Sequence, residues 1–141
     1  MPLRLVPAVH RATHRVGLYL AGLRQRGLTQ GEAHILALLA ARAPATIADL
    51  HRGLAHKRST LTSILDRLTA RGLVTREVGV ADRRTFVVRL TPEGRTVARR
   101  VERRLAALEN AVGRQVSAAE VRAFLKVVSA LVEEAHRRTR R

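Results

Sequence analysis

Short hydroxyl and cationic side chains share one face of a helix predicted between Lys57 and Arg71. The apolar residues of this segment recur at spacings of three and four, which places them on the opposite face: Leu61, Ile64, Leu65 and Leu68. The polar face carries Arg58, Ser59, Thr60, Thr62, Ser63 and Arg67. A helix in the major groove of DNA needs such short donors and cations to reach bases and phosphates. An ordinary solvated face would contain more glutamate and lysine, so the pattern favours a DNA-facing helix.

One acid, Asp66, lies within this polar face. A carboxylate at this position can orient a neighbouring arginine, or it can accept a hydrogen bond from a cytosine amine. Both interpretations remain open from the sequence.

A second candidate site lies at the tip of a predicted β-hairpin. Residues 73–78 are β-prone, residues 79–84 form a polar turn, and apolar residues then alternate at period two to give one buried face: Phe86, Val88 and Leu90. The tip carries Asp82, Arg83 and Arg84. Adjacent arginines on a short turn can enter the minor groove, where negative potential is concentrated. Asp82 is expected to hold an arginine and the turn in shape.

The other elements are marked by helix-start signals. Residues 29–32 and 117–120 each form a capping box, in which a hydroxyl and a returning glutamate satisfy free backbone amides. Thr46 can cap a short helix. Thr91-Pro92-Glu93 begins a long helix with proline at its first position, and Gly113 interrupts the apolar pattern of that helix.

Each predicted helix carries an apolar face at helical spacing. The residues predicted to point inward are Val9, Ala12, Val16, Tyr19 and Leu23 in the first helix, Ile35, Leu38 and Leu39 in the second, Ile47, Leu50 and Leu54 in the third, Val97, Val101, Leu105, Leu108 and Val112 in the long helix, and Val121, Phe124, Leu125, Val128, Leu131 and Val132 in the last. The first, long and last helices have no obvious partner within one small domain. They are therefore predicted to form a dimerisation layer, followed by a frayed basic tail that contains Arg137, Arg138, Arg140 and Arg141.

The charge of the chain points to a polyanionic partner. The 141 residues carry 27 lysines and arginines against 11 acids, a formal net charge of +16. Residues 52–104, around the predicted helix and hairpin, carry 14 of these cations and 5 acids. Because a polyanion would relieve the self-repulsion, nucleic acid is the leading partner.

Several other classes of protein are disfavoured. The chain has no cysteine, which excludes disulfides, thiolate metal clusters and thiol chemistry. The longest apolar run, residues 35–41, is too short to cross a bilayer. No phosphate-binding loop, nucleophile elbow or paired catalytic carboxylates occur, so neither an enzyme nor a cofactor is predicted. His10 and His14 could share a metal from one helix face, but no acid or thiol completes a site, and polar interface positions are favoured.

The order helix, helix, short helix, helix, hairpin, long helix, helix predicts a mainly α-helical winged helix-turn-helix with a helical dimerisation layer. In this order the sequence resembles the MarR family of bacterial transcription regulators. The resemblance is carried by Asp82-Arg83-Arg84, by residues 86–94 (FVVRLTPEG), and by Ser59-Thr60-Leu61-Thr62 with residues 65–68 (LDRL) and 71–74 (RGLV). It extends from about Val9 to Ala135.

The resemblance implies a homodimer whose first, fifth and sixth helices interlock and whose two winged units bind a pseudo-palindromic double-stranded operator. It also implies a cleft for a small-molecule effector, Arg84 as the minor-groove arginine, Asp82 as its stabilising partner, and Ser59, Thr60 and Thr62 facing DNA. The sequence departs from the family at two places. His51 and Gly53 fall inside the short helix, where the family tends to have alanine or other helix formers. Ser63 stands where a cation is frequent, so the family's base-reading pattern cannot be transferred.

The sequence therefore predicts a single structural domain in three segments: a dimerisation helix in residues 1–28, a DNA-binding lobe in 29–94, and dimerisation helices with a basic tail in 95–141. The predicted protein is a dimeric repressor in the bacterial cytoplasm, associated with the nucleoid when bound to DNA. The main alternative is a nucleic-acid-binding protein without sequence preference, architectural or RNA-binding. A small enzyme or a protein-docking module is a weaker alternative.

Overall fold

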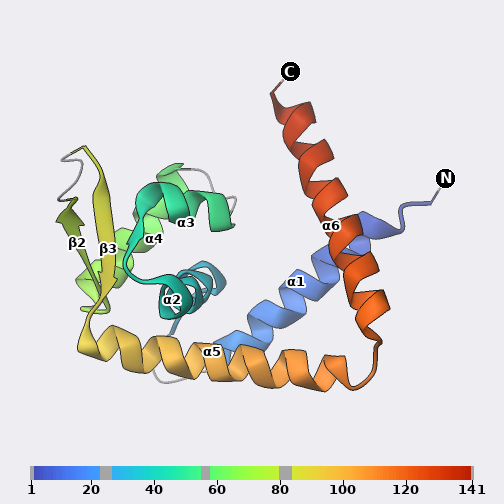
Figure 1. Ribbon diagram of the computed structural model, residues 1–141, viewed down its shortest axis with the longest axis horizontal. Coiled ribbons are helices and arrows are strands. Elements are labelled where there is room, and N and C mark those ends of the chain that lie inside the picture. The colour runs from blue at the N-terminus through green and yellow to red at the C-terminus, as the bar shows by residue number, and fades with distance from the viewer. Residues whose placement is uncertain (1, 23–26, 55–57, 80–83, 141) are drawn as a thin grey trace. The chain divides into compact units, whose positions relative to one another are not determined.

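The computed structural model describes residues 2–22, 27–54, 58–79 and 84–140. It divides into two compact units, residues 1–104, here named the winged unit, and residues 105–141, the C-terminal unit. The winged unit contains α1 (Leu5–Ala21), α2 (Gln30–Arg42), β1 (Ala45–Thr46), α3 (Ile47–Leu54), α4 (Arg58–Ala70), β2 (Val74–Val78), β3 (Phe86–Leu90) and the first part of α5 (Pro92–Gly113) (Figure 1). The C-terminal unit contains the end of α5 and α6 (Ala118–Thr139). The predicted order of helices and hairpin is confirmed.

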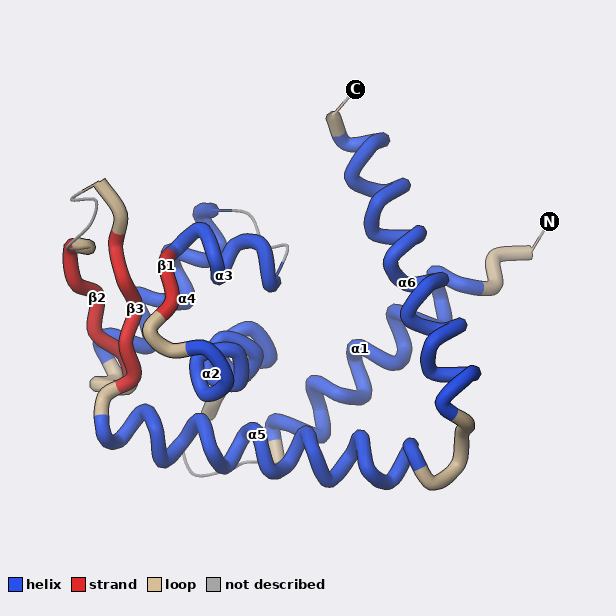
Figure 2. Tube along the Cα trace, in the orientation of Figure 1, coloured by secondary structure: helices blue, strands red, loops and turns tan. Residues whose placement is uncertain are grey.

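The hairpin belongs to a three-stranded antiparallel sheet in the order β1-β3-β2 (Figure 2). Val74 pairs with Leu90 and Val78 with Phe86, while Ala45 of β1 pairs with Val88 on the other side of β3. The sequence did not predict β1, because two residues are too few to show a period-two pattern.

The core of the winged unit is built from α2, α3, α4, the sheet and the start of α5. All four predicted inward residues of α4 are buried, as are Ile35, Leu39 and Leu50. Leu38 is only partly buried against this core, and Leu36 is fully buried in addition to the predicted residues. The side chain of Leu54 lies outside the described part of the chain.

The predicted helix starts are confirmed by their hydrogen bonds. Both capping boxes are complete: Thr29 with Glu32 in α2 and Ser117 with Glu120 in α6. The Thr46 hydroxyl accepts from the backbone N–H of Asp49 at 3.1 Å, which caps α3. These bonds satisfy amide donors that a helix N-terminus leaves without a partner.

The end of α4 has the geometry of a Schellman motif. Gly72 has a φ of +69°, a conformation that glycine adopts without steric cost. The Leu73 N–H donates to the Leu68 carbonyl at 3.0 Å, and the Gly72 N–H donates to the Thr69 carbonyl at 3.0 Å. The glycine predicted to stop the helix therefore turns the chain into β2.

Predictions about inward faces are wrong for the isolated chain at several residues, among them Val112 of α5, which is exposed. Phe86 is 50 % exposed, because the buried face of β3 ends at Val88. In α1 the buried residue is Leu20, which the predicted stripe did not include. In α6 no residue is buried, and Phe124 is 60 % exposed, because no element of its own unit covers this face.

The predicted fraying of the basic tail is also wrong for two of its arginines. Helix α6 continues to Thr139, so Arg137 and Arg138 are helical. Both donate to the carboxylate of Glu134, and the Arg138 Nε to Glu134 Oε1 distance is 2.7 Å. Pairs three and four residues apart lie on the same helix face, and this spacing holds the last turn together.

Candidate nucleic-acid interface

The polar face of α4 is exposed along its first two turns. Ser59, Thr60, Thr62 and Ser63 are all exposed, while the apolar face of the same helix is buried. Arg58 is the first residue of α4, and its side chain lies outside the described part of the chain. The separation of faces predicted from the sequence is present, and the contacts of this face with DNA stay a prediction.

Arg67, the last residue of the predicted DNA face, turns partly toward the protein. Its Nε donates to Glu32 Oε1 at 2.9 Å, and its Nη1 donates to Ser63 Oγ at 2.9 Å. Arg71 binds the other oxygen of the same carboxylate at 3.1 Å. From the sequence alone, the only role predicted for Glu32 is in a capping box. The sequence signal that could have indicated a shared partner is the four-residue spacing of Arg67 and Arg71, which places both arginines on one helix face.

Asp66 makes an ion pair between α4 and β2. The Arg76 Nη2 lies 2.6 Å from Asp66 Oδ1. Of the two interpretations that the sequence left open, the structure therefore places an arginine on this carboxylate. The pair ties the middle of α4 to the strand that leads to the wing.

The wing is described up to Gly79 and again from Arg84. Asp82 and Arg83, two of the three predicted wing residues, lie outside the described residues. Arg84 is exposed, and with Phe86 and His51 it lines a shallow pocket of about 360 Å³ beside the first turn of α3. Across the hairpin, the Arg89 Nε donates to Glu77 Oε2 at 3.1 Å, a cross-strand pair that stabilises the base of the wing.

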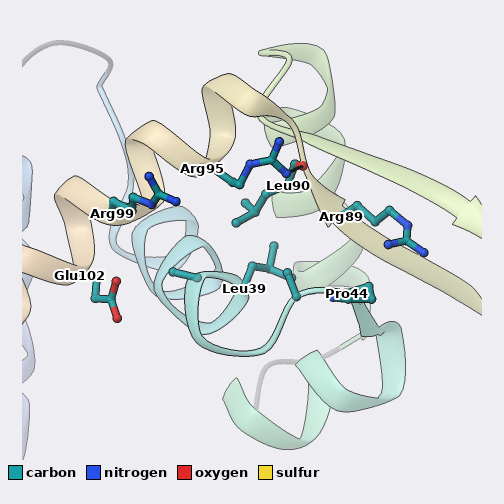
Figure 3. A pocket seen from close by; sticks show the side chains of 9 residues that line it. Leu39, Pro44, Arg89, Leu90, Arg95, Arg99 and Glu102 are labelled. Atoms are coloured by element: carbon teal, nitrogen blue, oxygen red, sulfur yellow. Dashed lines mark hydrogen bonds between the residues drawn. The ribbon is translucent and has the colours of Figure 1, made fainter.

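A further pocket of about 290 Å³ lies between the C-terminal end of α2, β3 and the first part of α5. Leu39, Pro44 and Leu90 supply apolar walls, while arginines and one glutamate line the α5 side (Figure 3). Arg95 lies beside Leu90 and donates to its carbonyl at 3.3 Å. The volume is just below the range for pockets that bind organic ligands, which begins at about 300 Å³.

The described residues contain no group of three or more histidines, acids or cysteines that could hold a metal ion. His10 and His14 are both exposed on α1. None of the described helices is long and apolar enough to cross a membrane.

Comparisons with known proteins connect this geometry to a family. A model of the MarR family matches residues 26–85. The fold matches a MepR–DNA complex from S. aureus with a TM-score of 0.80 and 19 % identity, covering 95 % of this chain and 99 % of that chain. It also matches the PcaV transcriptional regulator from Streptomyces coelicolor bound to its natural ligand, with a TM-score of 0.75 and 23 % identity over 96 % and 99 % of the chains.

A mutant of MarR from E. coli matches with a TM-score of 0.66 and 25 % identity over 94 % of this chain and 97 % of that chain. No curated protein sequence matches. The family model covers α2, α3, α4 and β2, and structures of MarR-family regulators share the fold over at least 94 % of the chain. Residues 26–85 are therefore similar to the MarR family of transcription regulators, and the chain shares the winged helix-turn-helix fold of the solved MarR-family structures.

Proposed function

We propose that the protein is a sequence-specific regulator that binds double-stranded DNA as a homodimer, represses transcription, and releases DNA when a small-molecule effector binds. The observation that carries this proposal is the exposed row of four hydroxyls on α4, supported underneath by a fully packed apolar face. Short hydroxyl side chains let a helix approach base edges closely. The packed face holds that helix against the rest of the winged unit, with the hydroxyl row outward.

Phosphate contacts would supply most of the affinity. Arg84 on the wing and the cations that surround α4 are suited to phosphate oxygens, and each contact releases condensed counterions. Binding is therefore expected to weaken steeply with salt. Asp82 and Arg83 complete the proposed wing site, with Arg83 and Arg84 at the minor groove.

The dimer is supported by the uncovered apolar faces of α6 and α1. Exposed apolar residues on α6 include Val121, Phe124, Leu125 and Val132, and those on α1 include Leu5, Val6 and Leu18. A contiguous apolar face marks an interaction surface. A two-fold dimer would present two α4 helices to half-sites about 34 Å apart, which matches a pseudo-palindromic operator.

The effector would act by shifting the population of dimers. The ligand must bind more tightly to a form whose α4 helices no longer match the half-site spacing. The arginine-lined pocket between α2, β3 and α5 is the place in the winged unit that we assign to it. The PcaV structure, solved with its natural ligand, supports this part by similarity of fold.

Fluorescence anisotropy near 150 mM salt tests the proposal. The labelled duplexes are DNA from upstream of the protein's own gene and a scrambled duplex of equal length. We expect a preference of about a thousandfold or more, the low end for specific regulators. Equal, salt-sensitive binding to both duplexes would instead support the sequence-nonspecific alternative, if genomic fragments selected by the protein are also bound with that same affinity. No binding to any duplex would overturn the proposal.

A further inference from the structure

Glu32 is the only charged residue that is buried among the described residues, with 2 % of its surface exposed. Three donors surround its carboxylate: the Thr29 N–H at 3.2 Å, the Arg67 Nε at 2.9 Å and the Arg71 Nη1 at 3.1 Å. A carboxylate taken out of water is unfavourable unless such partners replace the lost hydration. The burial of Glu32 and the positions of both arginines are therefore coupled.

The same contacts fix the C-terminal end of α4 to the N-terminal end of α2. Arg67 lies on the last turn of α4 and Arg71 directly follows it. Apolar packing alone is non-directional and tolerates small rotations of a helix. The charged hydrogen bonds from Arg67 and Arg71 are directional, so they select one rotation of α4 about its axis.

Arg67 extends this network to the DNA face. Its second donor, Nη1, binds Ser63 Oγ at 2.9 Å. A serine hydroxyl has one hydrogen to donate and two lone pairs. One lone pair of Ser63 is occupied by the arginine, and no acceptor for its hydrogen occurs among the residues that the structure describes. Ser63 is thereby oriented as a hydrogen-bond donor toward solvent.

We propose that Glu32 and Arg67 are positioning residues for DNA readout, and that through them Ser63 acts as a donor to an acceptor edge in the major groove. This inference rests on the proposed function, since it assigns roles within the same DNA-binding surface. The acceptors that a donor can reach there are guanine O6 and N7, adenine N7 and thymine O4. In this arrangement Arg67 orients the Ser63 hydroxyl for the base contact and does not itself contact a phosphate.

The test compares E32Q, R67K and S63A with the wild type, using the operator and a scrambled duplex. In E32Q the helix cap is retained, because a glutamine oxygen can still accept from Thr29, but the charge that holds both arginines is lost. R67K keeps the positive charge but loses the guanidinium group, whose two nitrogens join Glu32 to Ser63. For all three we expect the ratio of operator to scrambled affinity to fall about tenfold, the effect of one lost base contact. Affinity for the scrambled duplex and the salt slope should stay unchanged.

Glu120 provides the matched control. It occupies the same position in the capping box of α6, is exposed, and has no arginine on its carboxylate in any hydrogen bond or ion pair of the described chain. E120Q should leave both affinities unchanged. The double variant E32Q/S63A should discriminate no worse than the poorer single variant, because the three residues act as one unit.

Three results with these variants would overturn the inference: full discrimination in E32Q, full discrimination in S63A, or an additive loss in E32Q/S63A. A further variant, R67Q, removes the positive charge of Arg67. A salt slope lowered by about one in R67Q would identify Arg67 as a phosphate contact and would likewise overturn the inference. If E32Q does not fold, S63A and R67K carry the test with Glu32 intact. If the wild type prefers no duplex, the proposed function fails by itself. The amide hydrogen-exchange rates of residues 58–70 then test whether Arg67 positions α4. R67K should raise these rates, and E120Q should leave them unchanged.

Discussion

Gly94 lies so close to Leu73 that a Cβ atom added to it would be 1.8 Å from the Leu73 carbonyl oxygen. The same carbonyl accepts from the Thr91 N–H at 3.1 Å, and the Thr91 hydroxyl donates to the Gly72 carbonyl at 2.6 Å and accepts from the Gly94 N–H at 2.9 Å. The start of α5 is thus bonded directly to the turn that follows α4. This contact explains in physical terms why a glycine is needed three residues after Thr91.

Gly94→Ala should destabilise the protein by about 3 kcal/mol or more, because the clash is with backbone that cannot move aside. Thermal or urea unfolding measures the change. Gly113→Ala is the control, since no atom lies within 4 Å of a Cβ at that position. It should have no cost, and a comparable loss in both variants would contradict the steric explanation.

Thr62→Ala should lower operator affinity about tenfold and leave scrambled-duplex affinity unchanged, because an exposed hydroxyl of α4 would lose a base contact. Anisotropy titrations with both duplexes provide the measurement. Thr69→Ala serves as the control from the same helix, because the Thr69 hydroxyl donates to the Leu65 carbonyl at 2.8 Å. Equal losses in the two variants would argue against readout by Thr62.

Arg84→Ala should weaken binding to operator and scrambled duplex by similar factors and reduce the salt slope by about one, as expected for the loss of a backbone contact. The measurement is Kd against salt concentration. Arg138→Ala removes the same charge from α6, where Arg138 pairs with Glu134, and should leave the slope unchanged. An unchanged slope in Arg84→Ala, and likewise in Arg83→Ala, would remove the wing from the proposed interface.

Phe124→Asp should raise the dimer dissociation constant about a hundredfold or more. A buried phenylalanine stabilises by about 2 kcal/mol, and a two-fold interface contains it twice. Sedimentation equilibrium gives the constant. Ala130→Asp places the same charge on the opposite face of α6, where it should have little effect. If Phe124→Asp dimerises like the wild type, a different surface joins the protomers.

Glu120 should titrate below its ordinary pKa of 4.5, because its carboxylate accepts hydrogen bonds from the backbone N–H of Ser117 and interacts with the Ser117 side chain. A lowered pKa in the folded state stabilises the fold above the ordinary pKa. That contribution disappears as the pH falls through the lowered value. An NMR titration of the Glu120 carboxyl carbon measures it, and Ser117→Ala should move the pKa back toward 4.5. A wild-type value at or above 4.5 would mean that the capping box does not form in solution.

Short-range signals in the sequence determined most of the fold. Capping boxes, the Thr91-Pro92 start and the glycine stop at Gly72 act within about four residues, so their hydrogen bonds are fixed by local chemistry. Apolar spacing determined the buried face of α4 in the same way. Once the apolar face of α4 is known to be buried, its other face must be exposed. That exposed hydroxyl face is the central part of the candidate site.

Tertiary structure decided what depends on partners distant in the chain. Strand β1 exists because β3 offers it an edge, and Gly94 is required because Leu73 lies against it. Arg67 and Arg71 converge on Glu32, more than thirty residues earlier. Local periodicity predicts which face of a helix is apolar. The role of a polar side chain depends instead on the partner atom that it contacts, and only the packing of the elements determines which atom that is.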